Sequence, residues 1–309
     1  MRENYKKILI RTSLLLIFVI FSGLIIYNLA KGIHEYIENR IDVETIEVIE
    51  GINEEVLEEE NIEELPKVES INEIIEKHLD EYGSYCRDNS SIYYMDLISD
   101  EIVDHNGDKE FVGASTYKLL LNIVAYENVI NGYINLTDLV YYNDSDYEDW
   151  SYVQPVIGAC YEVGELLDYS IIYSDNIASN MMLRYLGGYY NVMIEASDIL
   201  NVDIYPSNNI QTSKNLATAL KYLYKNKENE HYQHLLEVMC ETVYHDRLDK
   251  YIPTELVAHK IGQYDGCIHD AGIILTSNPY ILVVMTDNLL DSYEFIAELS
   301  SKIYNRNQT

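Results

Sequence analysis

Three short motifs constrain this chain more than any other feature of its sequence, because they set which distant segments must meet. In chain order they are Ser115-x-x-Lys118, Ser174-Asp175-Asn176 and Lys260-Ile261-Gly262. Residues three apart on a helix face the same way, so Ser115 and Lys118 would lie one turn apart. An unprotonated Lys118 amine could then take the proton of the Ser115 hydroxyl, as a serine nucleophile without a histidine requires. Burial and nearby positive charge would lower the pKa of Lys118 enough for this role.

Each motif alone also has a simpler structural interpretation. Ser115 could be a helix cap and Lys118 a surface lysine, while Ser-Asp-Asn is a common turn or cap sequence. The ordered set of three is much more specific, and it is similar to the motif set of class A β-lactamases and penicillin-binding proteins. From about Lys67 to the C-terminus, the chain therefore resembles the class A β-lactamase-like serine hydrolases, or penicillin-recognising enzymes.

The resemblance implies catalytic roles for the first two motifs. Ser115 would be the nucleophile and Lys118 its base. Ser174 would relay a proton to the leaving nitrogen, and Asn176 would bind the substrate amide.

The third motif would complete the site. By resemblance, Lys260 would lower the pKa of Lys118 and attract a substrate carboxylate. The backbone N–H groups of Ser115 and of Gln263, which follows Gly262, would form the oxyanion hole.

Two features depart from the family pattern. The position that usually carries Thr or Ser in the third motif is Ile261, so carboxylate binding would need another donor, such as Gln263 or Thr276. The loop glutamate that activates the deacylating water in class A β-lactamases has no match, because residues 187–212 contain one glutamate, Glu195, inside a helical pattern. We therefore expect slow release of an acyl group.

The resemblance implies an α+β fold of the β-lactamase/transpeptidase type, with helices flanking a five-stranded antiparallel sheet and a helical subdomain beside it. The spacing of apolar residues agrees with this fold. It predicts strands over residues 91–97, 101–105, 256–261, 267–275 and 280–286. It predicts helices over residues 68–81, 116–130, 164–173, 177–186, 191–200, 213–224, 231–243 and 290–303.

The N-terminal residues predict a membrane anchor. Residues 12–30 are uncharged and predominantly apolar. This stretch is about as long as a helix must be to span a membrane. Four basic residues within residues 1–11 would keep that segment in the cytoplasm. A cleaved signal peptide is the alternative, but Leu29 occupies a position where signal-peptide cleavage sites carry a small residue. The acidic residues 31–66 would form a solvated stalk, leaving residues 67–309 as the hydrolase domain at the outer side of the cell membrane.

The composition limits the partners. The formal net charge is −31, from 52 acidic and 21 basic residues, which excludes nucleic acid as a partner on electrostatic grounds. The four cysteines have no metal-like spacing, and we expect scattered core thiols; their pairing is open. We expect no cofactor or metal ion, and a monomeric catalytic domain.

The sequence therefore favours a membrane-anchored serine hydrolase that forms an acyl-enzyme with β-lactams or D-alanyl peptides. Two alternatives stay open. One is a D-alanyl carboxypeptidase or esterase. The other is a non-catalytic module that binds cell-wall peptides, which Ile261 would favour.

Overall fold

The computed structural model describes residues 69–156 and 158–308, all within one compact unit, Val68–Thr309. The predicted segments 1–11, 12–30 and 31–66 lie outside these residues. Among the residues described, no helix is both long enough and apolar enough to span a bilayer.

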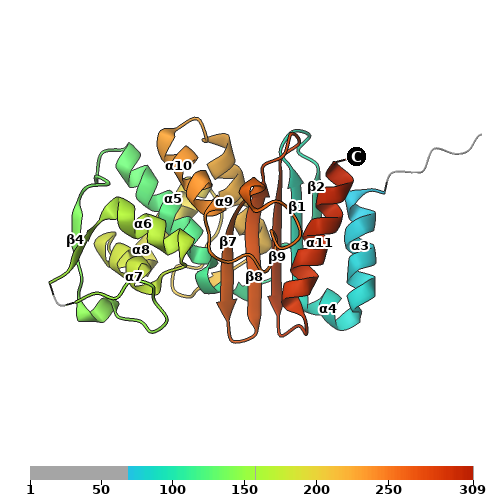
Figure 1. The fold of residues 1–309 in the computed structure, drawn as a ribbon, viewed down its shortest axis with the longest axis horizontal. Helices are drawn as coiled ribbons and strands as arrows, with labels where there is room; N and C mark the ends of the chain where they lie inside the picture. The colour runs from blue at the N-terminus through green and yellow to red at the C-terminus, as the bar shows by residue number, and fades with distance from the viewer. Residues whose placement is uncertain (1–68, 157, 309) are drawn as a thin grey trace, which may run out of the picture. The chain divides into compact units, whose positions relative to one another are not determined.

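A five-stranded antiparallel sheet forms the centre of the unit, with the strand order β2-β1-β9-β8-β7 (Figure 1). Its strands are β1 (Ser90–Asp96), β2 (Ile102–His105), β7 (Val257–Tyr264), β8 (Cys267–Ile274) and β9 (Tyr280–Asp287). All five predicted strands are confirmed. Strands β8 and β9 are fully buried apart from Asp287, and for β9 this agrees with its continuous apolar sequence.

Helices cover both faces of the sheet (Figure 1). On one face lie α3 (Ile71–Tyr82) and α11 (Ser292–Asn307). The helical part on the other side comprises α5 (Tyr117–Ile130), α6 (Val163–Ile172), α7 (Asn176–Tyr185), α8 (Tyr189–Leu200), α9 (Ser213–Lys225) and α10 (Glu230–Cys240). All eight predicted helices are present. A capping box explains the start of α3, because Ser70 and Glu73 bond each other's backbone N–H groups.

Short elements that the periodicity did not predict lie between these helices. They are α4 (Ser84–Asn89), η2 (Asp144–Asp146), η3 (Thr254–Leu256), and two small ribbons, β3 (Phe111–Val112) with β6 (Ile210–Gln211) and β4 (Leu139–Tyr141) with β5 (Cys160–Glu162). Strands of two or three residues are too short to show a period.

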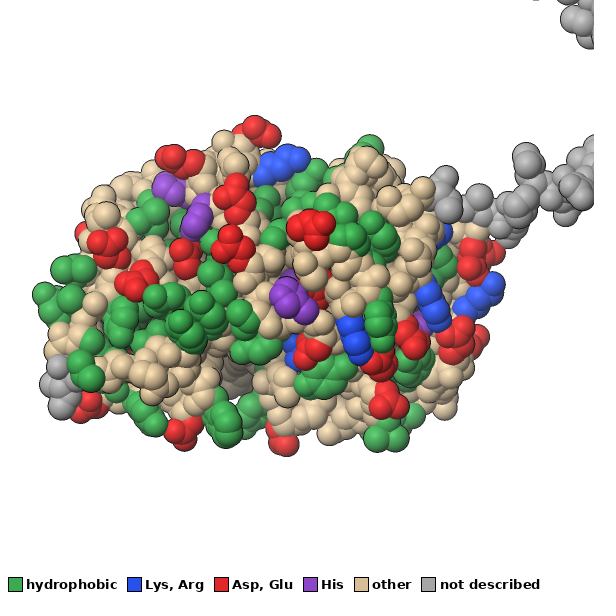
Figure 2. Space-filling view, in the orientation of Figure 1, with side chains coloured by type: hydrophobic (Ala, Val, Ile, Leu, Met, Phe, Trp, Pro, Cys, Tyr) green, Lys and Arg blue, Asp and Glu red, His purple; other side chains and the backbone are tan. Residues whose placement is uncertain are grey.

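Strand β7 separates two hydrophobic cores. Ala258 belongs to the core under the helical part, whereas Val257 belongs to the core under α3 and α11. Side chains alternate along a strand, so Lys260 points to the first side and His259 to the second. Acidic side chains are scattered over the face of the molecule drawn in Figure 2 rather than gathered in one patch.

The four cysteines are free thiols. Cys86 and Cys267 are buried, as expected of core thiols. Cys160 is exposed and Cys240 half-buried, so the expectation of core thiols is wrong for Cys160.

Candidate active site

The proposed nucleophile lies in a tight turn rather than at a helix cap. Ser115 is the middle residue of a 3-10 turn, η1 (Ala114–Thr116), and α5 begins only at Tyr117. Ala114 has a φ of 47°, in the left-handed region that few non-glycine residues adopt. Asn209 holds it there by donating its side-chain N–H to the Ala114 carbonyl at 2.7 Å. Such strain, held by surrounding bonds, is typical of functional sites.

The third motif lies directly beside this turn. A Cβ atom added at Gly262 would lie 2.9 Å from the Gly113 carbonyl oxygen and 2.9 Å from the Thr116 methyl group. Only glycine therefore allows β7 to approach the turn that carries Ser115. Strand β7 is the edge strand of the sheet, and an edge strand presents N–H groups that no neighbouring strand uses.

The second motif is a loop that ends in a helix cap. Ser174 has a φ of 51°, also in the left-handed region. Asp175 accepts hydrogen bonds from the backbone N–H groups of Ala178 and Val153, both at 2.7 Å, and so caps α7 and fixes the loop before it. Asn176 is the first residue of α7, and its side-chain oxygen accepts a hydrogen bond from the Lys118 Nζ.

Two buried lysines from different motifs meet at Ser174. The Lys260 Nζ donates to the Ser174 Oγ at 2.9 Å, and the Lys118 Nζ approaches the same oxygen at 3.5 Å. Both lysine side chains are almost fully buried. The structure thus brings all three motifs together, as the motif order predicts.

Lys118 forms no hydrogen bond with Ser115 among the described residues. Its Nζ donates to the Ser174 carbonyl, to the Ser174 Oγ and, at 2.7 Å, to the Asn176 Oδ1. Among the hydrogen bonds of the described residues, none joins Lys118 to Ser115, so the predicted direct bond is absent. Three bonds donated by one amine correspond to a lysine ammonium ion, which has no free lone pair.

The surroundings of Lys118 and Lys260 favour loss of a proton from each ammonium group. Burial lowers the pKa of Lys118 to about 7, although Asp175 and Glu148 partly oppose the shift. Burial also lowers the pKa of Lys260 well below its usual range, and the positive charge of Lys118 adds to the effect. A pKa lowered toward neutrality suits Lys118 to act as a general base.

Comparison with known proteins identifies the family. Residues 71–307 match the model of the β-lactamase enzyme family, a stretch that includes all three motifs. The chain belongs to the β-lactamase enzyme family. It is accordingly a serine hydrolase, and the family expected from the motifs is confirmed.

Solved structures show the same fold. The structure of PBP-A is similar with a TM-score of 0.69 and 21% identity, over 76% of this chain and 96% of that one. An ancestral class A β-lactamase has a TM-score of 0.68 and 21% identity, over 76% and 99% of the two chains. A β-lactamase from Sphaerobacter thermophilus has a TM-score of 0.63 and 22% identity, over 71% and 90%.

Within this β-lactamase fold, the structure separates the two donors considered for the site beside Ile261. Thr276 lies beyond the end of β8, six residues from Asp270, which pairs with Ile261. Six strand residues span about 20 Å, and the Thr276 hydroxyl donates to the Asn278 carbonyl instead. Thr276 therefore cannot replace the missing hydroxyl. Gln263, two residues from Ile261 on the same side of the strand, is exposed and remains available.

Gln263 is held by a residue that the sequence analysis missed. The Arg247 guanidinium donates to the Gln263 Oε1 at 3.0 Å. Arginine has no acceptor, so the Gln263 oxygen must face it and the amide NH₂ group points elsewhere. Neither Arg247 nor Asn209 belongs to a motif, and no sequence signal marked them.

Glu195 is excluded as a base at Ser115. It lies in α8, as predicted, and accepts a hydrogen bond from Asn128 near the far end of α5. Asn128 follows Ser115 by 13 residues, and a helix of that length extends about 20 Å. The expectation that residues 187–212 lack a loop glutamate agrees with this placement.

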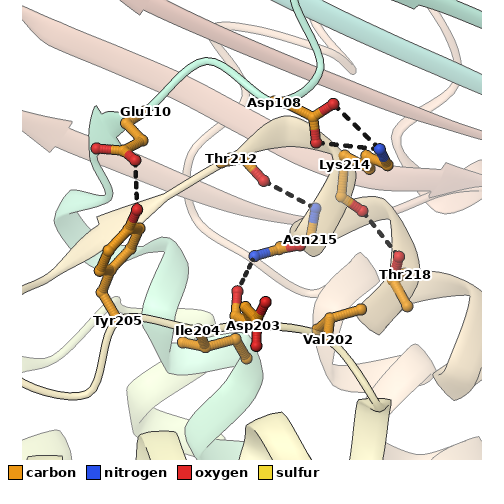
Figure 3. A pocket seen from close by; sticks show the side chains of 10 residues that line it. All are labelled: Asp108, Glu110, Val202, Asp203, Ile204, Tyr205, Thr212, Lys214, Asn215 and Thr218. Atoms are coloured by element: carbon orange, nitrogen blue, oxygen red, sulfur yellow. Dashed lines mark hydrogen bonds and ion pairs between the residues drawn. The ribbon is translucent and has the colours of Figure 1, made fainter.

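A cavity of about 590 Å³ lies away from the three motifs. It is lined by α9 and the segment before β6, and its polar groups already pair with each other, as Lys214 does with Asp108 (Figure 3). None of the predicted site residues lines it.

Proposed function

We propose that this protein is a membrane-anchored, extracytoplasmic hydrolase that forms an acyl-enzyme through Ser115 with β-lactams or D-alanyl peptides. The observation that carries the proposal is the meeting of Lys118 and Lys260 at the Ser174 hydroxyl, beside the turn of Ser115. Support also comes from a mutant of PBP-A, whose structure is an acyl-enzyme complex with penicillin G.

The contacts of Ser174 with Lys118 and Lys260 suggest the second half of a proton path, and the first half, from Ser115 to Lys118, follows from the resemblance of the motifs. The neutral Lys118 amine accepts the Ser115 hydroxyl proton while the Ser115 Oγ bonds to the substrate carbonyl carbon. The carbon–nitrogen bond then breaks, and Ser174 gives its hydroxyl proton to the leaving nitrogen. Lys118 returns a proton to Ser174, so the proton lost by Ser115 ends on the leaving group. Lys260 keeps Ser174 oriented throughout.

Gln263 is proposed to bind the substrate carboxylate in place of the hydroxyl missing at Ile261. Arg247 occupies the Gln263 oxygen, which leaves the NH₂ group free to donate to a substrate carboxylate. An amide donor to a carboxylate is a hydrogen bond to a charged group, stronger than a neutral one.

Acyl release is proposed to be slow. The carboxylates whose negative charge raises the pKa of Lys118 are those of Asp175 and Glu148. Asp175 is committed to two backbone N–H groups, and Glu195 points to the far end of α5. Loss of a positioned base typically costs about 10²- to 10⁴-fold in rate, so the adduct should persist.

Mass spectrometry of the full-length chain in detergent tests this function. Incubation with penicillin G should add the mass of one penicillin to the peptide that contains Ser115. Ser115→Ala should abolish the adduct, whereas Ser145→Ala, at an exposed serine, should leave it intact. Release of D-alanine from a D-alanyl-D-alanine peptide without a lasting adduct would favour the carboxypeptidase. Neither adduct nor turnover would favour the binding module.

The anchor is a separate part of the proposal. The uncharged residues 12–30, with basic residues before them and acidic residues after them, predict an N-in orientation. Protease added to intact cells should therefore remove the domain that follows residue 44. Complete protection of that domain would refute this orientation.

A further inference from the structure

A second cluster of reactive side chains lies on the other side of β7 from Lys260. It consists of His259 in β7 and of His245 and Asp249 in the segment that joins α10 to β7. One ligand atom from each residue lies within 4.8 Å of the other two. His259 and Asp249 are fully buried, whereas His245 reaches the surface.

Two atoms in this cluster lack hydrogen-bond partners. Among the described residues, neither the His259 Nε2 nor the Asp249 Oδ1 has one, although both residues are buried. The His259 Nε2 lies 3.5 Å from the Asp249 Oδ2, but the pair forms no hydrogen bond. A buried polar group left without a partner costs about 1–3 kcal/mol. Each residue therefore keeps one buried polar atom that a further group could bind.

The other nitrogen of His259 is fixed by Asp270. The His259 Nδ1 lies 2.9 Å from both Asp270 carboxylate oxygens. Asp270 also accepts the backbone N–H of Leu248 at 3.1 Å, which ties the segment of His245 and Asp249 to the sheet. A carboxylate that holds one imidazole nitrogen, while the other nitrogen points into a ligand cluster, is the usual support of a metal-bound histidine.

We propose that His245, Asp249 and His259 bind one divalent transition-metal ion of the zinc class, with Asp270 as the residue that positions His259. Two imidazole nitrogens and one carboxylate oxygen form a ligand set that Zn²⁺ takes with a fourth ligand from solvent. Ligand atoms about 2.0–2.2 Å from one ion at tetrahedral angles lie roughly 3.3–3.6 Å apart, and the separation of the Asp249 Oδ2 and the His259 Nε2 is 3.5 Å. The His245 Nδ1 is hydrogen-bonded to the same Asp249 oxygen and would exchange this bond for the ion. The exposed His245 gives the ion access from solvent.

The competing explanation is an ion pair without metal. In that case His259 carries a proton on Nε2 as well and is held between Asp249 and Asp270. This alternative predicts no stoichiometric metal binding, so measurement separates the two. The site is independent of Ser115, and its test does not depend on the proposed acylation.

Zinc binding by the full-length chain in detergent tests the proposal. After treatment with a chelator, the protein is dialysed against low-micromolar Zn²⁺, and the bound metal is measured by inductively coupled plasma mass spectrometry. The wild type should hold one ion per chain, and His245→Ala should lose it. His234→Ala is the matched control, because His234 and His245 are each 46% exposed and each pair with an aspartate, Asp168 for His234.

A second variant keeps all three ligands. Asp270→Asn should weaken zinc binding about 10- to 100-fold, as expected for loss of the group that orients a metal-bound histidine. Co²⁺ should give visible absorption bands in the wild type and His234→Ala but not in His245→Ala, with folding checked by circular dichroism. Less than a stoichiometric ion in the wild type, or equal loss in His234→Ala and His245→Ala, would overturn the proposal.

Discussion

His259 and Lys260 are neighbours in β7, yet their side chains lie in opposite electrostatic surroundings. Lys260 meets another buried lysine, Lys118, at Ser174. His259 lies between the carboxylates of Asp249 and Asp270. One strand therefore carries a site that disfavours positive charge on one side and a site that favours it on the other.

The comparison shows that the partners, rather than burial itself, decide the charge of a buried base. Burial and the charge of Lys118 both lower the pKa of Lys260. Burial would also lower the pKa of His259, but Asp270 and Asp249 outweigh it and raise the pKa to about 9. The lysine side of β7 is suited to deliver a neutral amine. The carboxylates on the histidine side stabilise positive charge, which His259 itself carries when no metal ion is bound.

Removal of the base on the lysine side should have the largest effect. Lys118→Met should slow acylation of Ser115 by penicillin G about 10²- to 10⁴-fold, because it removes the proposed general base. Stopped-flow measurement with a fluorescent penicillin checks this. Lys214→Met, at an exposed lysine paired with Asp108, is the control and should acylate normally. Equal rates in wild type and Lys118→Met would remove Lys118 from the mechanism.

Gly262→Ala should have the next largest effect, since it tests the close contact between β7 and the turn of Ser115. The added methyl group would lie 2.9 Å from the Gly113 carbonyl and would push the turn away from Lys260. A shift of about 1 Å can cost about 10²-fold in rate, so acylation should fall by that order. Gly164→Ala is the control, because its nearest atoms lie at 3.6 Å. An unchanged rate in Gly262→Ala would show that the contact does not position Ser115.

Gln263→Leu should have a smaller effect, confined to substrate binding. Loss of one hydrogen bond to a carboxylate costs about 1.5–3 kcal/mol, or roughly 10- to 100-fold in the penicillin concentration that gives half-maximal acylation. The maximal rate should change little. Gln233→Leu, at an exposed glutamine in α10, should have no effect. A fall in the maximal rate alone would assign Gln263 a different role.

Glu195→Gln should have the smallest effect. Its carboxylate bonds to Asn128 at the far end of α5, so the lifetime of the penicillin adduct should stay within about twofold of wild type. Mass spectrometry over time measures that lifetime. A much longer lifetime in Glu195→Gln would mean that Glu195 activates water after all. Glu148→Gln is the more informative variant, because the charge of Glu148 raises the pKa of Lys118.

The sequence predicted the lysine side of β7 far better than the histidine side. Ser115 with Lys118, and Lys260 with Gly262, are local patterns whose spacing already has a chemical meaning. The strands and most helix bounds followed from apolar periodicity for the same reason. In contrast, His245 and Asp249 come from an irregular segment whose path only tertiary packing decides. The 3-10 turn before α5 is held by Asn209, 94 positions from Ser115, so local sequence could not predict it either.

A titration of Lys118 by NMR tests the central claim most directly, namely that this buried lysine is a neutral amine near physiological pH. The full-length chain in detergent, labelled with ¹³C at the lysine ε-carbons, is compared with Lys118→Met to assign the signal. One signal absent from Lys118→Met should titrate near pH 7, and acylation by penicillin should rise with pH through the same range, because deprotonation frees the lone pair. A Lys118 signal that titrates near 10, with acylation still rising above pH 9, would contradict the account.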